Sequence, residues 1–341
     1  MAKATASVVI PNFNGLRFLR RLMESLAAQS EPAWTALVVD DASTDGSVGY
    51  LSRDWPAVRL IVNRTNAGFA ASCNRGLRAA ETPFVVLLNN DTHVDPNWLR
   101  EGLAAFQSPD VAAVASLVLL ADPPHLIDTA GDMYSVVGGA VKRAHLLPPQ
   151  AADSLSAQAF SACGASAFYR RDSLVSVGLL DERLESYYED VDVGFRLAWA
   201  GYRCLFAPRS VCYHHLSSSY DPKGWRYHCN SARNAEIVWW SYLPKRLRRR
   251  YLLSHLAFLA LQAGHKLRQG CLLPYVAGKW QAVRRLGQIR DKRRALREIV
   301  RVDDRAIEDL LVRDWWSLHV GSRLASGATG GATAENDGGA A

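Results

Sequence analysis

An apolar run turns abruptly polar in Phe84-Val-Val-Leu-Leu-Asn-Asn-Asp-Thr-His-Val-Asp-Pro96. The run before the amides has the unbroken hydrophobic character of a strand that is buried on both faces of a parallel sheet. Asp91 therefore falls at the carboxyl end of a strand. In open α/β sheets the ligand crevice lies outside those ends, so a carboxylate among Asn89, Asn90 and His93 is placed to meet a metal or a phosphate. An Asx turn that merely ends the strand is the alternative interpretation.

The segments before this strand predict the repeating unit of a parallel sheet. Residues 7–10 are mostly β-branched, and turn-forming residues follow them through Gly15. Leucines then recur at helical spacing over residues 16–26, and residues 34–40 form a second apolar run that ends in aspartates. Strand, helix and strand in this order build a parallel βαβ unit.

A third short strand is expected at residues 58–62, followed by a helix that starts near Gly68. Gly68 and the small residues 70–72 would let backbone N–H groups approach a phosphate closely, helped by the positive end of the helix. Tight packing of the helix on the sheet explains the small residues equally well.

The chain beyond Pro96 is less regular. A helix is expected at residues 98–106 and a strand at 111–115, while 117–159 is interpreted as irregular. Residues 186–192 carry clustered acids at the start of a helix that should end at Gly201. The helix dipole favours acids in the first turn, and this alone can explain their position. Two short strands at 202–208 and 210–215 follow, and the second brings a pair of histidines.

Composition is that of a globular chain: of 341 residues, 49% are hydrophobic and 21% are charged. This length fits two domains, or one large domain with an appendage. The six cysteines form no C-x-x-C pair and the first residues show no secretory signal pattern, so reduced thiols in the cytosol are expected.

The C-terminal third combines basic and apolar segments. A basic block at 245–250 precedes a nearly apolar run at 251–261, which is too short for the roughly 20 residues that a membrane span needs. A second basic series follows at 284–297. Anchorage on an anionic leaflet is expected, with a helical subdomain on the core or a dimer interface as alternatives. Beyond about residue 325, the Gly, Ala and Thr composition predicts a disordered tail.

Four segments in this order resemble the family 2 glycosyltransferases of the GT-A fold, particularly their rhamnosyltransferase-like branch. They read SVVIPNFNG, VVDDASTDGS, NAGFAASCNRG with LLNNDTHVDP, and YYEDVDVGFRLAWAGYRCLFAPRSVCYHH. The resemblance implies an α/β, Rossmann-like nucleotide-diphospho-sugar transferase with a mixed sheet flanked by helices and a C-terminal helical appendage. Residues 1–100 would form the nucleotide-sugar half, 101–222 the acceptor and catalytic half, 223–325 the basic helical region and 326–341 the tail.

The resemblance also assigns roles to individual residues. The donor nucleotide would be bound by Pro11, Asn12, Phe13, Asp41, Asn66, Gly68, Asn74 and Asn90. Of these, Asp41 would read the base, because a carboxylate can accept the imide N–H that uracil and thymine share. A divalent metal, Mg²⁺ or Mn²⁺, would be held by Asp91 and His214. His215 competes with His214, but strand alternation should turn only one of them into the site.

Catalysis is assigned in the same way. Asp190 falls on the family's catalytic base, and the acceptor would meet Gly164, Ala165, Glu189 and Asp192. A sugar hydroxyl is a poor nucleophile, so a positioned carboxylate takes its proton during attack. A single base implies one in-line displacement with inversion.

The predicted function is transfer of a sugar from a nucleoside diphosphate to a glycan or polyprenyl-linked glycan in cell-surface polysaccharide synthesis. The protein would be cytoplasmic and peripheral on the inner face of the membrane. Rhamnose from dTDP-rhamnose is the preferred donor, and a UDP-sugar for galactofuranosyl, glucosyl or N-acetylhexosaminyl transfer is the alternative. A dinucleotide-binding oxidoreductase would need G-x-G-x-x-G after the first strand, which is absent. A non-enzymatic nucleic-acid-binding protein would leave the acids at the strand ends unexplained.

Overall fold

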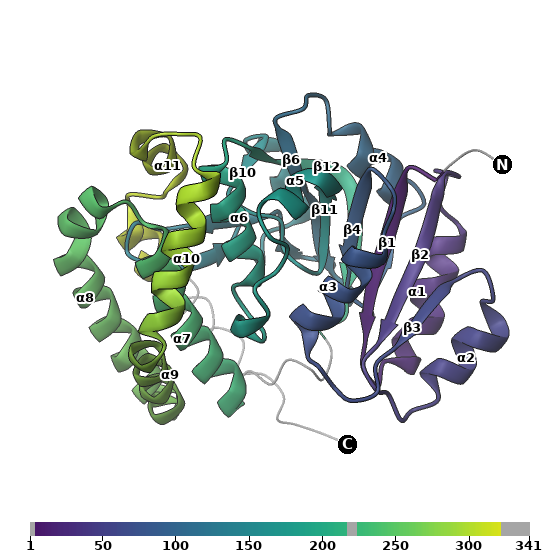
Figure 1. Ribbon diagram of the computed structural model, residues 1–341, viewed down its shortest axis with the longest axis horizontal. Coiled ribbons are helices and arrows are strands. Elements are labelled where there is room, and N and C mark those ends of the chain that lie inside the picture. The colour runs from purple at the N-terminus through teal and green to yellow at the C-terminus, as the bar shows by residue number, and fades with distance from the viewer. Residues whose placement is uncertain (1–3, 217–223, 322–341) are drawn as a thin grey trace, which may run out of the picture.

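The computed structural model describes residues 4–216 and 224–321 of the chain. The predicted tail at 326–341 lies outside the described residues. Figure 1 shows an α/β body on one side and a group of helices, α7 to α11, on the other. The six cysteines are free thiols.

One mixed sheet runs through the body in the order β10-β12-β6-β11-β4-β1-β2-β3, with β5 added to β12 and β7 to β6. Strands β1 to β4 are parallel, β11 is antiparallel to both of its neighbours, and β12 is parallel to β6. The strands are β1 (Ala6–Asn12), β2 (Trp34–Asp40), β3 (Arg59–Val62), β4 (Phe84–Leu88), β5 (Thr92–Val94), β6 (Val111–Leu120), β7 (Ile127–Thr129), β10 (Gln158–Ala159), β11 (Ser166–Arg170) and β12 (Arg203–His214). A small second sheet pairs β8 (Asp132–Tyr134) with β9 (Ala140–Lys142).

Helices cover both faces of the sheet because strand side chains alternate between them. Val8 and Ile10 pack with α1, α2 and α4 on one face, and Val9 packs with α3, α5 and α6 on the other. Gly76 allows α3 to lie close to the sheet, since a Cβ atom there would stand 2.4 Å from Cγ1 of Val9. The helices in the body are α1 (Leu16–Ala27), α2 (Ser47–Asp54), α3 (Phe69–Ala79), α4 (Trp98–Ala104), α5 (Arg171–Ser176) and α6 (Glu189–Trp199), with 3₁₀ turns at Pro149–Ser154 and Glu182–Leu184.

Two expectations about the second half were wrong. Strand β6 continues to Leu120, and the segment interpreted as irregular contains β7, β8, β9 and β10, which are too short, at two or three residues each, to show a periodic pattern. The two short strands expected around Pro208 are one strand, β12, with an irregular register between Ala207 and Val211. A proline can be accommodated at such a bulge without ending the strand.

The C-terminal helices pack on the body through a hydrophobic core that both parts share. Trp239, Tyr242 and Leu247 pack with Tyr134 and Phe195 in one buried cluster. Within the described residues, no helix is both long and apolar enough to cross a membrane. These helices are α7 (Trp225–Tyr242), α8 (Lys245–Arg268), α9 (Leu272–Arg284), α10 (Leu286–Ile299) and α11 (Asp304–Leu310), followed by a short π-helix at Ser317–Gly321.

Candidate active site

The carboxyl ends of β1, β2 and β4 are joined by a chain of polar side chains. Asn12 is 1% exposed, and its amide donates to Asp40 at 2.8 Å while its carbonyl accepts from Nδ2 of Asn90 at 2.8 Å. Because parallel strands end at the same edge of a sheet, residues far apart in sequence meet here. These hydrogen bonds hold the Asn90 side chain at the carboxyl ends of the strands, next in sequence to Asp91.

His214 lies against Asp91 because β12 pairs with β5. His214 and Thr92 are register partners, and Nε2 of His214 stands 3.4 Å from Oδ1 of Asp91. The backbone N–H of His215 donates to the carbonyl of Asp91, but its ring packs beside Phe18. The structure therefore brings His214, and not the ring of His215, to the carboxylate.

Asp128, on β7, holds the other side of the His214 ring. Its Oδ2 atom lies 3.0 Å from Nδ1 of His214, and its Oδ1 atom accepts a hydrogen bond from Lys142. Burial favours the neutral carboxyl, but the hydrogen bond with His214 and the charge of Lys142 lower the pKa of Asp128 well below its usual range. Burial alone would lower the pKa of His214, yet its hydrogen bonds with Asp128 and Asp91 raise that pKa to about 9.

The donor atoms around Asp91 fit a divalent cation that is shared with a diphosphate. The 3.4 Å between Nε2 of His214 and Oδ1 of Asp91 suits two ligands of one ion. Oδ1 of Asn89 is buried and has no hydrogen-bond partner among the described residues. Among residues 4–216 and 224–321, no group of three or more His, Cys, Asp or Glu side chains could hold an ion by itself. Phosphate oxygens and water would therefore complete the coordination.

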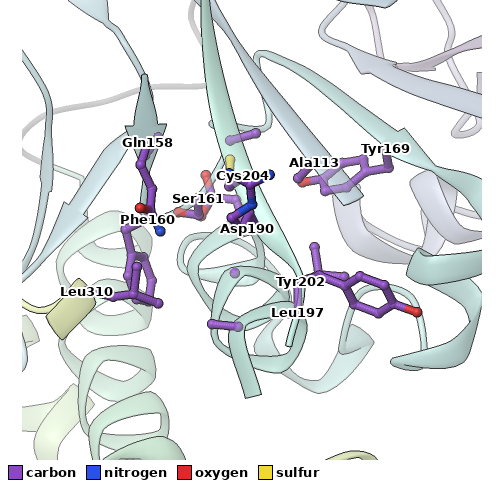
Figure 2. Close-up of a pocket in the computed structure, with 15 residues that line it drawn as sticks. Ala113, Gln158, Phe160, Ser161, Tyr169, Asp190, Leu197, Tyr202, Cys204 and Leu310 are labelled. Carbon is purple, nitrogen blue, oxygen red and sulfur yellow. The ribbon is translucent and has the colours of Figure 1, made fainter. Parts of the chain in front are cut away.

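Asp190 lies in the first turn of α6 and is bonded to the segment before β11. One oxygen accepts from the N–H of Gly164 at 3.2 Å, and the other accepts from the N–H of Val191 at 2.8 Å. Burial raises the pKa of Asp190, and these N–H groups offset part of that rise. Figure 2 shows Asp190, Ser161 and Cys204 gathered at a small pocket that residues of α6 help to line. A carboxylate that two backbone N–H groups hold in place beside a pocket is positioned to accept a proton from a bound hydroxyl.

Two further acids surround Asp190. Glu189 is 8% exposed, and burial together with the charge of Asp190 raises its pKa to about 8. Oε2 of Glu189 has no hydrogen-bond partner within the described residues. Asp132 accepts a hydrogen bond from Ser161 at 2.7 Å, and burial, with the charge of Asp190, raises the pKa of Asp132 as well.

The segment Gly164–Ala165 connects the two halves of the site. Gly164 donates its N–H to Asp190, while the carbonyl of Ala165 accepts from the N–H of Asn89 at 3.1 Å. A single backbone step thus sets the distance between the acid on α6 and the amide and acid cluster after β4. The sequence placed these residues in one site, and the structure brings them together.

The remaining donor residues divide into two groups. Phe13 is 50% exposed and Asn66 is exposed at the rim, whereas Pro11 is buried at the end of β1. Asp41 is 4% exposed and accepts from the N–H groups of Ala67 and Gly68, both at 2.8 Å. In this arrangement Asp41 fixes the loop before α3, with Gly68 at φ +90°, and its contact with a base stays a prediction.

Two predicted contacts do not fit the geometry. Asn74 was expected at the diphosphate, but it is 1% exposed and exchanges two hydrogen bonds with the backbone of Leu180. Asp192 was expected at the acceptor, but it is fully buried and bonded to Arg196, Tyr242 and Lys292. Both side chains join elements of the fold, because their polar atoms are already used inside it.

Asp128, Asp132 and Lys142 were missed by sequence reasoning. They lie in the segment that was interpreted as irregular, and β7 and β8 are only three residues long each. The available signal was Ile127-Asp-Thr-Ala-Gly-Asp132, where two acids stand among apolar and small residues. Buried acids need partners, so such a segment indicates a polar contact inside the protein.

Comparison with known sequences gives consistent matches. The family model described as glycosyl transferase family 2 matches residues 7–178. The O-antigen biosynthesis protein RfbC of Myxococcus xanthus is 30% identical over 223 residues, which are 62% of this chain and only 17% of that protein. The N-acetylglucosaminyl-diphospho-decaprenol L-rhamnosyltransferase of Mycobacterium tuberculosis is 28% identical over 231 residues, 59% of this chain and 73% of that protein.

Solved structures show the same fold at low sequence identity. GalNAc-T7 with UDP, GalNAc and Mn²⁺ has a TM-score of 0.62 and 16% identity, covering 95% of this chain and 58% of that one. The mannosyltransferase PcManGT of Pyrobaculum calidifontis, in complex with GDP-Man and Mn²⁺, has a TM-score of 0.53 and 16% identity, covering 97% and 85%. The expected GT-A-like sheet is confirmed. The sequence match over half of the chain then decides the family: this chain belongs to glycosyl transferase family 2.

Proposed function

We propose that this protein is an inverting glycosyltransferase that moves a sugar, preferably rhamnose from dTDP-rhamnose, onto a glycan or polyprenyl-linked glycan. The observation that carries the proposal is the link through Gly164–Ala165, which holds Asp190 on one side and the Asn89–Asp91 cluster on the other. Those are the two chemical functions that sugar transfer requires: a base for the acceptor and a place for the leaving diphosphate.

The residues divide the reaction between them. Asp190 accepts the proton of the acceptor hydroxyl as its oxygen attacks the anomeric carbon, which places inversion at that carbon. The side chains of Asp91 and His214 would hold a divalent ion, which when bound stabilises charge on the departing diphosphate as a Lewis acid. Asp128 keeps the His214 ring oriented toward Asp91, as partners of metal-binding histidines do. The Asp41-bound loop and Phe13 form the side on which the nucleotide would lie.

The rhamnosyl preference rests on a relative and not on a contact in the site. The Mycobacterium tuberculosis protein of 28% identity is named a rhamnosyltransferase acting on a decaprenyl-linked acceptor. Transfer to a polyprenyl-linked glycan would take place at the inner face of the cytoplasmic membrane and would serve cell-surface polysaccharide synthesis. A UDP-sugar donor remains the alternative.

Thermal shifts with dTDP, UDP and GDP, each with and without Mn²⁺ or Mg²⁺, test the donor. Selective stabilisation by dTDP supports the rhamnosyl proposal, and selective stabilisation by UDP contradicts it. Stabilisation that does not depend on the metal contradicts the role given to Asp91 and His214.

The Asp190→Asn variant tests the base. It should keep the nucleotide-induced thermal shift and lose at least about 100-fold in transfer rate, because the general base is gone. Asp172→Asn, an exposed acid on α5, is the matched control. Near-normal transfer by Asp190→Asn would remove Asp190 from this role, and retention of configuration in the product would exclude a single displacement.

A further inference from the structure

The positive charge of the chain is concentrated in helices α8 to α10. Residues 245–300 contain fifteen Lys and Arg against two Asp and Glu, whereas the rest of the chain contains 25 against 31. The segment therefore has a formal charge of +13, and the remainder of the chain has −6. The net charge of +7 is thus a property of these helices and not of the catalytic body.

Helix α8 packs one face against the rest of the protein and exposes the opposite face to solvent. Leu247, His255 and Phe258 are buried, and His255 stacks on Trp239 and contacts the carbonyl of Val137 at 2.7 Å. The opposite face exposes Leu253 at 80%, Leu256 at 52% and Leu267 at 63%. These leucines follow helical spacing, so they form one stripe along the outer side of the helix.

Helix α9 repeats this arrangement beside α8. Its Tyr275 is buried and donates to the carbonyl of Leu259 on α8 at 3.2 Å. Its outer side exposes Leu273 at 75%, Val276 at 51% and Trp280 at 61%. The turn between the two helices carries Leu267 and Leu273 on its two sides, next to Arg268. Figure 1 shows α8 and α9 at the outer end of the molecule, away from β1 to β3.

These side chains form an exceptional gathering of exposed apolar groups. Of the eighteen large hydrophobic side chains exposed among the described residues, ten lie between Leu252 and Leu286. Single exposed leucines are ordinary, but two neighbouring stripes on helices that also expose Arg249, Arg268 and Arg284 indicate a surface that binds something. We name Leu253, Leu256, Leu267, Leu273, Val276 and Trp280 the docking face.

The charge distribution selects the occupant. A second copy of the chain would bring two surfaces with exposed Arg249, Arg268 and Arg284 together, which like-charge repulsion opposes. A nucleic acid would meet the cations but would leave the leucines in water. An anionic lipid surface satisfies both features, because apolar side chains enter the headgroup region while Lys and Arg meet the phosphates.

We propose that the docking face binds the surface of an anionic phospholipid bilayer, with α8 and α9 lying on the membrane and the catalytic body held beside it. Binding depends on the two helices and is independent of which sugar the active site transfers. It would bring the site to acceptors that are anchored in the same bilayer.

Vesicle flotation with the full chain tests the proposal. The wild type should float with phosphatidylcholine vesicles that contain about one third phosphatidylglycerol, and much less with pure phosphatidylcholine, at about 0.1 M salt. The double variants Leu253→Ser/Leu256→Ser and Leu273→Ser/Trp280→Ser should each bind at least about tenfold more weakly. Val62→Ser/Val175→Ser removes two exposed aliphatic side chains of the body and is the matched control. Circular dichroism verifies that every variant is folded.

Three outcomes would overturn the proposal. The wild type could stay unbound with anionic vesicles, or the docking-face variants could bind as the control does. Light scattering could instead show a dimer that the docking-face variants dissociate, and the face would then be an interface between copies. Nucleotide-induced thermal shifts of the same variants should match the wild type, so a failure of membrane binding is distinguishable from a failure of the proposed activity.

Discussion

Replacing Glu189 with glutamine should remove a pH dependence of folding stability. Glu189 is 8% exposed, and burial with the charge of Asp190 raises its pKa from 4.5 to about 8. Between these two values the unfolded chain has lost the proton and the folded protein has kept it. In this range the free energy of unfolding of the wild type therefore falls by about 1.4 kcal/mol for each pH unit. The stabilisation that comes from the protonated Glu189 side chain is fully present only below the pKa of the unfolded chain.

From pH 6 to pH 8 the difference should amount to about 2–3 kcal/mol, because the slope flattens near the folded pKa. The assay is urea denaturation of the wild type and of Glu189→Gln at both pH values. The free energy of unfolding should fall with pH by that much more in the wild type. Glu189 and Asp190 titrate together. The test is therefore the difference between the wild type and Glu189→Gln in how far the free energy of unfolding falls from pH 6 to pH 8.

Glu24 gives the matched control, because it is an exposed glutamate on α1. Glu24→Gln should keep the wild-type dependence on pH. If Glu189→Gln and the wild type lose stability in parallel between pH 6 and pH 8, Glu189 is ionised in the folded protein and the reasoning from burial is refuted.

Two other substitutions test the polar contacts around the site. Asp128→Asn should weaken Mn²⁺ binding about 10- to 100-fold, because it removes the carboxylate that orients His214. Titration of free Mn²⁺ by electron paramagnetic resonance measures the affinity, and an unchanged affinity would show that Asp128 has no such role. Lys292→Met should lower the free energy of unfolding, measured in urea, by about 3 kcal/mol, since buried Asp192 loses one cation and Asp181 loses a partner at 2.6 Å. Replacing the exposed Arg290 on the same helix with methionine should cost almost nothing, and equal values for the two variants would contradict the buried network.

Local sequence was sufficient for strands β1 to β4 and for helices α1, α3 and α4 of the first half, but not for β5. The apolar residues of α1 at Leu19, Leu22, Met23 and Leu26 are the buried ones, as their spacing predicts. The strands β1, β2 and β4 are continuous apolar runs because the sheet is covered on both faces. These signals lie within one element, so they can be read without knowing the partners.

The second half depended on contacts between distant segments. Strand β7 has three residues and is defined by pairing with β6, so no local pattern announced that Asp128 would reach His214. Strand β12 continues past Pro208 because β6 supports it on both sides of the irregular register. Pairing with β6, and not propensity, decided both elements.

The sequence by itself determined that acids and amides follow the apolar strands, and hence that Asp91 stands at the carboxyl edge of the sheet. It also determined that α6 begins with Glu189, Asp190 and Asp192. Only the tertiary structure decided what each of these carboxylates contacts. Two residues along a helix are separated by about 200°, so Asp190 meets Gly164 in the site while Asp192 turns inward to Lys292 and Tyr242. A sequence shows which residues share a helix, but the neighbours packed around that helix determine which of its carboxylates meets a substrate.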